Sequence, residues 1–84
     1  MYDYYFTFKS ITGAQSGERL LVRNGVAVRL LRTPKHLSHN GCGYSLRVRG
    51  RDLAAALNLF YRGNVPYTRV FRVGADGTAE EVAP

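Results

Sequence analysis

The residues best suited to chemistry lie together in the segment HLSHNGCG, residues 36–43, which holds both histidines and the single cysteine of the 84-residue chain. His36, His39 and Cys42 follow one another at intervals of three residues, so a helical turn would bring three metal-ligand types to one side. A closed structural zinc site needs a fourth ligand, and no acidic residue lies nearby in the sequence. The segment is therefore compatible with a reactive thiol, a turn containing a small buried sulfur or, with the least support, a metal site.

The single cysteine cannot form an internal disulfide, so Cys42 serves structure, reactivity or intermolecular pairing. Gly41 and Gly43 flank it, and their missing β-carbons would open access to the sulfur and let backbone amides approach a partner. Residues 33–37 resemble a capped helical turn whose basic residues could fold back over the thiol. The alternative is that Gly41 makes a turn and Cys42 begins a strand as a buried apolar residue.

Positive charge dominates the composition. Twelve lysines and arginines stand against six acidic residues, which gives a formal net charge of +6 and an isoelectric point near 10.0. This excess favours polyanions or an acidic protein partner, with plain solubility as the alternative explanation. No apolar run approaches the ~20 residues of a membrane span, and the N-terminal segment lacks the pattern of a signal peptide. We therefore expect a cytoplasmic protein with no membrane contact.

The hydrophobic pattern alternates between strand and helix periods. Strands are predicted at residues 2–9, 26–32, 44–49 and 65–73, from alternating apolar positions. One helix is predicted after a cap at Ser10 or Thr12 and ends at Asn24-Gly25, and a second begins at Asp52 and ends at Gly63. A single domain of residues 1–73 follows, and residues 74–84 are expected to form a polar, flexible tail.

This βαββαβ order predicts an α+β fold of the ferredoxin-like type, in which a four-stranded antiparallel sheet has both helices on one face. We expect the first and third strands to be parallel neighbours. The connection between the second and third strands is expected to emerge where both helices end. Because a helix C-terminus disfavours an anion, activation of Cys42 would then have to come from nearby cations.

The sheet face without helices would carry aromatic and arginine side chains, which can stack on bases and pair with phosphates. The predicted nucleic-acid residues are Tyr5, Lys9, Arg29, Arg47 and Arg49, and the same face would include Thr7, Leu31 and Ser45. The alternatives for this face are a solvated surface or the contact of a homodimer. Neither a phosphate-binding loop nor a pair of carboxylates with an evident partner occurs, so a self-sufficient enzyme is not expected.

The pattern of residues 33–43 resembles that of a small bacterial family, the selenium/sulfur carrier protein-like family. The resemblance rests on Thr33-Pro34, on Lys35, on Leu37-Ser38 and on Cys42-Gly43, and it extends over roughly residues 4–72. Residues 39–41 depart from the small residues common in the family, which weakens the metal interpretation.

The resemblance implies that Cys42 carries a sulfur or selenium atom as a persulfide or selenopersulfide. A donor such as a cysteine desulfurase would load it, and an acceptor protein would receive the atom. The residues expected to support the thiol are Gly41, Gly43, Ser38, Lys35, Arg32, Thr33 and Pro34. Such a protein is a non-enzymatic carrier without a cofactor, and its basic surface would dock acidic partner proteins. The alternative is a nucleic-acid or protein-interaction module that uses the open sheet face and does not need Cys42.

Overall fold

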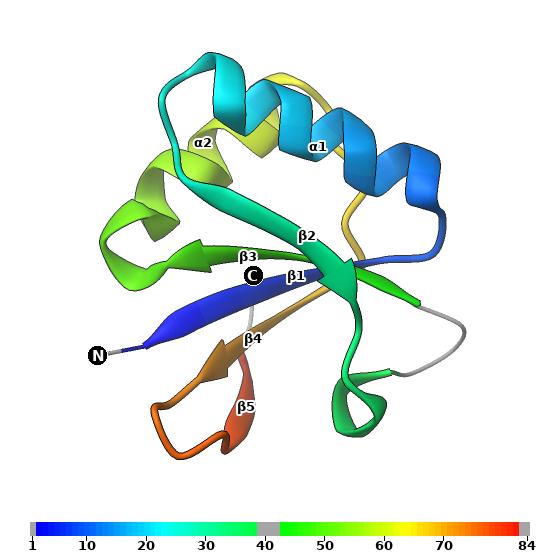
Figure 1. The fold of residues 1–84 in the computed structure, drawn as a ribbon. Coiled ribbons are helices and arrows are strands. Elements are labelled where there is room, and N and C mark those ends of the chain that lie inside the picture. The colour runs from blue at the N-terminus through cyan, green and yellow to red at the C-terminus, as the bar shows by residue number, and fades with distance from the viewer. Residues whose placement is uncertain (1, 39–42, 83–84) are drawn as a thin grey trace.

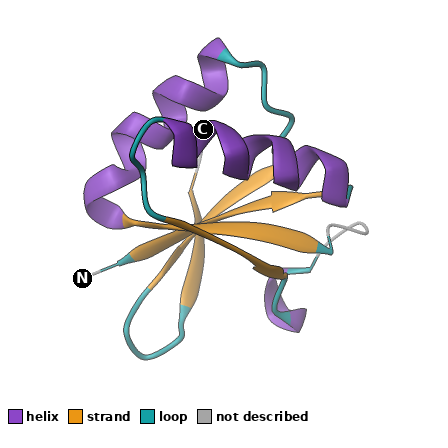
Figure 2. Cartoon of the chain, turned by 45° about the horizontal axis from the view of Figure 1, so that its top comes forward, coloured by secondary structure: helices purple, strands orange, loops and turns teal. Residues whose placement is uncertain are grey.

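The protein is an α+β domain, seen here in a computed structural model that describes residues 2–38 and 43–82. In chain order its elements are β1 (Asp3–Phe8), α1 (Ile11–Arg23), β2 (Val28–Arg32), the short 3₁₀-helix η1 (Lys35–Leu37), β3 (Tyr44–Arg49), the 3₁₀-helix η2 (Gly50–Asp52), α2 (Leu53–Arg62), β4 (Arg69–Val73) and β5 (Ala79–Val82). The strands form one antiparallel sheet in the order β2-β3-β1-β4-β5. Figures 1 and 2 show both α-helices on one side of this sheet.

The sheet differs from the prediction in two respects. It has five strands rather than four, because β5 pairs with β4 at one edge. In addition, β1 and β3 are antiparallel neighbours, so the expectation of a parallel pair was wrong. The α+β class and the antiparallel sheet are confirmed, and the ferredoxin-like assignment stays a prediction.

The fifth strand comes from residues that were expected to belong to a polar tail. A turn at residues 74–78 precedes it, in which Gly77 has a φ of 87° and Asp76 accepts hydrogen bonds from the backbone and hydroxyl of Thr78 at 3.1 and 2.7 Å. These bonds hold the pKa of the Asp76 carboxyl below its usual range, the side-chain hydrogen bond contributing most. An Asp-Gly pair between two strands is a hairpin signal. It is the feature of the sequence that could have predicted β5.

Both helix boundaries follow from local chemistry. Ser10 caps α1, since its Oγ accepts a hydrogen bond from the backbone N–H of Gly13 at 3.1 Å. Asn24 ends this helix, and Gly25 follows in the left-handed region at a φ of 76°, where the absence of a β-carbon removes the steric cost. Gly63 is the C-cap of α2. The predicted caps Ser10 and Gly63 are therefore confirmed.

The main core lies between the helices and the sheet. Phe6 of β1 and Phe60 of α2 are both buried, and their rings meet edge to face with centroids 4.9 Å apart. Leu46 of β3 is fully buried in the same cluster. Gly17 lets α1 come close to this cluster, because a β-carbon there would lie 2.9 Å from Leu46 Cδ1 and 3.2 Å from Val65 Cγ1.

The close approach at Gly17 predicts opposite effects for two glycines of one helix. Gly17→Ala should lower the free energy of unfolding by about 1 kcal/mol, because overpacking costs about 1–3 kcal/mol and the helical preference of alanine returns only about 1. Gly13→Ala should raise it, since the nearest atom to a β-carbon there is 3.4 Å away. Urea unfolding of both variants measures the difference. Equal stabilisation by the two substitutions would contradict the packing described for α1.

Candidate functional site

The loop that contains Cys42 joins β2 to β3, and hydrogen bonds close its base. The N–H of Thr33 donates to the carbonyl of Gly43 at 3.0 Å, which extends the pairing of the two strands into the loop. The hydroxyls of Thr33 and Ser45 are 2.6 Å apart, and Ser45 is fully buried. These contacts determine where the two ends of the loop lie. Thr33 is thus a positioning residue for the segment that follows it.

The first part of the loop forms the helical turn that the sequence predicts. The backbone N–H of Leu37 donates to the carbonyl of Pro34 at 2.9 Å, and that of Ser38 donates to Lys35 at 3.2 Å. Leu37 is only 3% exposed, yet it is not part of the core cluster between the helices and the sheet. Figures 1 and 2 both show η1 on the side of the sheet away from α1 and α2. Leu37 is therefore buried on the side of the sheet that faces away from the helices.

That second face is partly covered, which corrects the expectation of an open face. Thr7 and Ser45 are fully buried and Phe71 is 5% exposed, although all three alternate onto the side opposite the helices. The hydroxyl of Thr7 lies 2.8 Å from that of Thr68, which satisfies it. Of the other residues predicted for this face, Tyr5, Leu31 and Arg47 are partly exposed, and Lys9, Arg29 and Arg49 are exposed.

Two cationic side chains belong to the described part of the loop and the strand end before it. Arg32 and Lys35 are exposed, as is His36, and the guanidinium of Arg32 lies 5.4 Å from the ring centroid of Tyr44, a cation–π distance. Between Glu18 and Asp52 the sequence contains eight arginines and lysines and no acidic residue. The loop therefore belongs to a stretch of chain whose positive charge is not balanced locally.

Residues 39–42 lie outside the described residues. The assignments of His39, Gly41 and Cys42, including the metal interpretation, therefore stay predictions. Next to them, a β-carbon on Gly43 would meet no atom of the described residues within 4 Å, its chain neighbours aside. In residues 2–38 and 43–82, no group of three or more histidine, cysteine or acidic side chains is close enough to hold a metal ion.

The helix termini at the loop end of the sheet also differ from the expectation, because α1 begins here and only α2 ends here. Because β2 and β1 both pair antiparallel with β3, they run in the same direction. The loop after β2 therefore emerges at the end of the sheet where β1 leads into α1 and where α2 leads into β4. The expectation that both helices end here was wrong. The N-terminus of α1 favours negative charge, so the dipole argument against a thiolate no longer holds for that helix.

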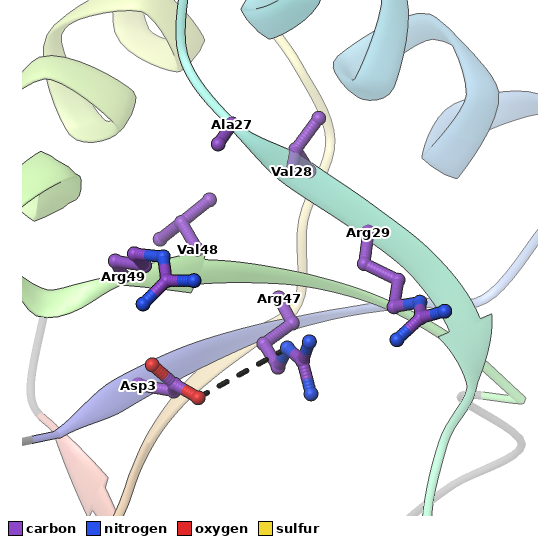
Figure 3. A pocket seen from close by; sticks show the side chains of 7 residues that line it. All are labelled: Asp3, Ala27, Val28, Arg29, Arg47, Val48 and Arg49. Carbon is purple, nitrogen blue, oxygen red and sulfur yellow. Dashed lines mark ion pairs between the residues drawn. The ribbon is translucent and has the colours of Figure 1, made fainter.

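A second feature lies at the opposite end of the β2–β3 hairpin. A pocket of about 300 Å³ is lined by Asp3, Ala27, Val28, Arg29, Arg47, Val48 and Arg49 (Figure 3). The Nε of Arg47 is 4.0 Å from Oδ2 of Asp3. The sequence pattern predicts the three arginines on one face but not Asp3, which reaches them only through the pairing of β1 with β3. The spacing of Arg47 and Arg49, two residues apart in a strand, is the sequence feature that could have predicted a cluster of positive charge at this end of the hairpin.

These observations define the class of protein. It is an antiparallel α+β domain whose single cysteine belongs to the loop between two paired strands, β2 and β3. The sequence matches the protein family described as "Putative Se/S carrier protein-like" over residues 3–72, and the chain belongs to this family. The match confirms the resemblance seen in the sequence, and it leaves β5 outside the matched region. No curated protein and no solved structure matches the chain. In the described ranges no helix is long and apolar enough to cross a membrane.

The hydroxyl pair at the base of the loop predicts a measurable coupling. Thr33→Val should lower the free energy of unfolding by about 1–3 kcal/mol, because it leaves the buried Ser45 hydroxyl without a partner. Adding Ser45→Ala should recover part of this loss, since the orphaned group is then removed. A double-mutant cycle by urea unfolding gives the coupling energy, with the exposed Thr12→Val as the control. Strict additivity of the two substitutions would contradict the role assigned to this bond.

Proposed function

We propose that the protein carries a sulfur or selenium atom on Cys42, as a persulfide or selenopersulfide, from a donor protein to an acceptor protein. The observation that carries the proposal is the family match, because the matched region contains the only cysteine of the chain. A carrier of this kind needs one accessible thiol and no second cysteine. The placement of the loop between two paired strands supports the proposal, since a fixed base presents the loop at one edge of the domain.

The transfer requires no oxidant. The Cys42 thiolate attacks the outer sulfur of a persulfide on the donor, and the donor's sulfur–sulfur bond breaks as a new one forms on Cys42. The donor cysteine leaves as a thiolate. In the second half an acceptor thiolate attacks the same outer sulfur, takes it and its proton, and regenerates the Cys42 thiolate. Selenium follows the same steps with a selenium–sulfur bond.

Both the thiolate and the ionised persulfide are anions, so neighbouring cations stabilise them. Lys35 and Arg32 supply positive charge from the two sides of Pro34. Ser38 adds a hydroxyl close to Cys42 in the sequence. Thr33 and Pro34 act as positioning residues, because their backbone groups take part in the loop base and in the turn of η1.

Residues 19–51 carry an excess of positive charge, of which only Arg47 and Arg51 pair with acidic residues in the described part of the chain, and this excess is suited to docking of acidic donor and acceptor proteins. Charge of this kind acts mainly on the association rate and is screened by salt. The alternative function, a nucleic-acid or homodimer contact through the sheet face, loses support because Thr7 and Ser45 are buried there. Of the residues predicted for this face, Arg29, Arg47 and Arg49 line a pocket, and this observation indicates a local site rather than an extended binding face.

Loading of the thiol tests the proposal. Reduced protein is incubated with a cysteine desulfurase and cysteine, and separately with inorganic polysulfide, and is then analysed by intact mass spectrometry. Wild type should gain one sulfur atom and Cys42→Ala none, while both unfold at the same urea concentration. Failure of wild type to gain sulfur from either source, or an equal gain in Cys42→Ala, would overturn the proposal.

Gly43 offers a test of partner access that is separate from folding. A β-carbon there meets no atom of the described residues within 4 Å, its chain neighbours aside, so Gly43→Ala should leave the free energy of unfolding unchanged or raise it by up to about 1 kcal/mol. Gly43→Val should slow loading by the desulfurase, because it adds bulk next to Cys42 in the chain. Loading by polysulfide is the control, since this small donor should react at the wild-type rate. Unchanged enzymatic loading of the valine variant would contradict the role of this glycine.

A further inference from the structure

The β2–β3 hairpin brings three arginines together at the end away from the Cys42 loop. Arg29 of β2 stands directly opposite Arg47 of β3, and Arg49 follows two residues later on the same face. Like charges directly opposite each other in an antiparallel pair are destabilising. An anion bound between these guanidinium groups would remove that cost.

Only part of this charge is balanced within the domain. Arg47 faces Asp3 across a 4.0 Å gap, and both side chains are more than one third exposed. Arg29 and Arg49 form no ion pair within the described ranges, although Asp3 is the cross-strand neighbour of Arg49 in the pairing of β1 with β3. Three guanidinium groups and one carboxylate leave two positive charges at the pocket.

The arginines of β4 show the contrast. Arg69 donates to Glu81 at 3.0 Å, and Arg72 donates to Glu80, so β5 supplies a carboxylate to each. The pairing with Glu80 raises the pKa of the Arg72 guanidinium above its ordinary value. In the β4–β5 hairpin the carboxylates of β5 therefore neutralise the arginines of β4. In the β2–β3 hairpin no strand residue is acidic, so the hairpin itself does not neutralise its arginines.

The guanidinium groups surround a hollow rather than a flat surface. Figure 3 shows Arg29, Arg47 and Arg49 with Asp3 around the same pocket, which has a volume of about 300 Å³. This is the lower end of the range for small-molecule sites. A guanidinium group presents a planar fork of N–H donors that matches two oxygens of a phosphate.

We propose that this pocket binds the phosphate group of a small phosphomonoester, such as a mononucleotide or a sugar phosphate. A phosphomonoester carries close to two negative charges at neutral pH, which matches the two positive charges of the pocket. A phosphodiester carries only one. The site lies at the other end of the hairpin from Cys42, so the proposal does not depend on the carrier function.

Calorimetry and thermal unfolding test the proposal with inorganic phosphate, adenosine 5′-monophosphate and ribose 5-phosphate. Each should bind saturably and raise the melting temperature above that in sodium chloride of equal ionic strength. Arg29→Gln should raise the dissociation constant at least ~10-fold, the loss typical of a charge-assisted hydrogen bond. Its melting temperature without phosphate should equal or exceed that of wild type, because the repulsion with Arg47 is gone.

The matched control is Arg19→Gln, which removes the same charge from an exposed position on α1, on the other side of the sheet. It should leave phosphate binding unchanged. Arg29→Lys keeps the charge but loses the planar fork, so it should bind several-fold more weakly than wild type. Cys42→Ala should bind phosphate as wild type does, so a failure of the carrier proposal would not affect this result.

Three outcomes would overturn the proposal. One is the absence of saturable binding by all three phosphate compounds. Another is an equal loss of affinity in Arg29→Gln and Arg19→Gln, which would indicate diffuse attraction rather than a site. The third is binding of an oligonucleotide that the monophosphates do not displace, since the arginines would then contact a nucleic-acid backbone.

Discussion

The antiparallel register between β2 and β3 determines where both candidate sites lie. It places Leu46 in the core between the sheet and the helices, where it is fully buried. A slip of one residue would bring Arg47 to that position and turn Leu46 to the other face, so burial specifies the register strongly. The same register sets Thr33 against Gly43 at the base of the loop and Arg29 against Arg47 at the pocket. The packing of one face of β3, through Leu46 and Val48, thus organises two regions with different chemistry.

The two regions are separated along one strand. Four residues of extended chain lead from Arg29 to Thr33, a distance of about 13 Å. This exceeds the screening length of ~8 Å at physiological ionic strength, so charges at one end act weakly on the other. Substitutions in the pocket should therefore leave the thiol chemistry unchanged. Both regions attract anions because the chain between Glu18 and Asp52 contains no acidic residue.

Periodicity and capping predicted most of the elements from the sequence. The spacing of Ala56 and Phe60 identifies the buried face of α2, and Ser10 identifies the start of α1. The polar composition of the last residues concealed β5, even though Asp76-Gly77 is a hairpin signal. Strand direction was misjudged because it depends on which strands pair, and local patterns do not reveal pairing.

The candidate site was predictable only in part for the same reason. Residue types and the family resemblance identify Cys42 and its basic neighbours. Ser45 is fully buried on the face away from the helices, and its hydroxyl partner Thr33 lies twelve residues away in the sequence. Asp3 joins the arginine pocket through pairing between β1 and β3, a contact between distant parts of the chain. Such tertiary contacts leave no local trace in the sequence.

The most direct test of the carrier function is whether Cys42 can both accept and release its cargo. Protein loaded with one sulfur atom is separated from its donor and treated with cyanide, which removes the outer sulfur of a persulfide as thiocyanate and leaves the thiolate. If Cys42 is a carrier, each chain should release one thiocyanate, recover its original mass and load a second time as completely as the first. Sulfur that stays on the protein, or a discharged protein that cannot be loaded again, would contradict it.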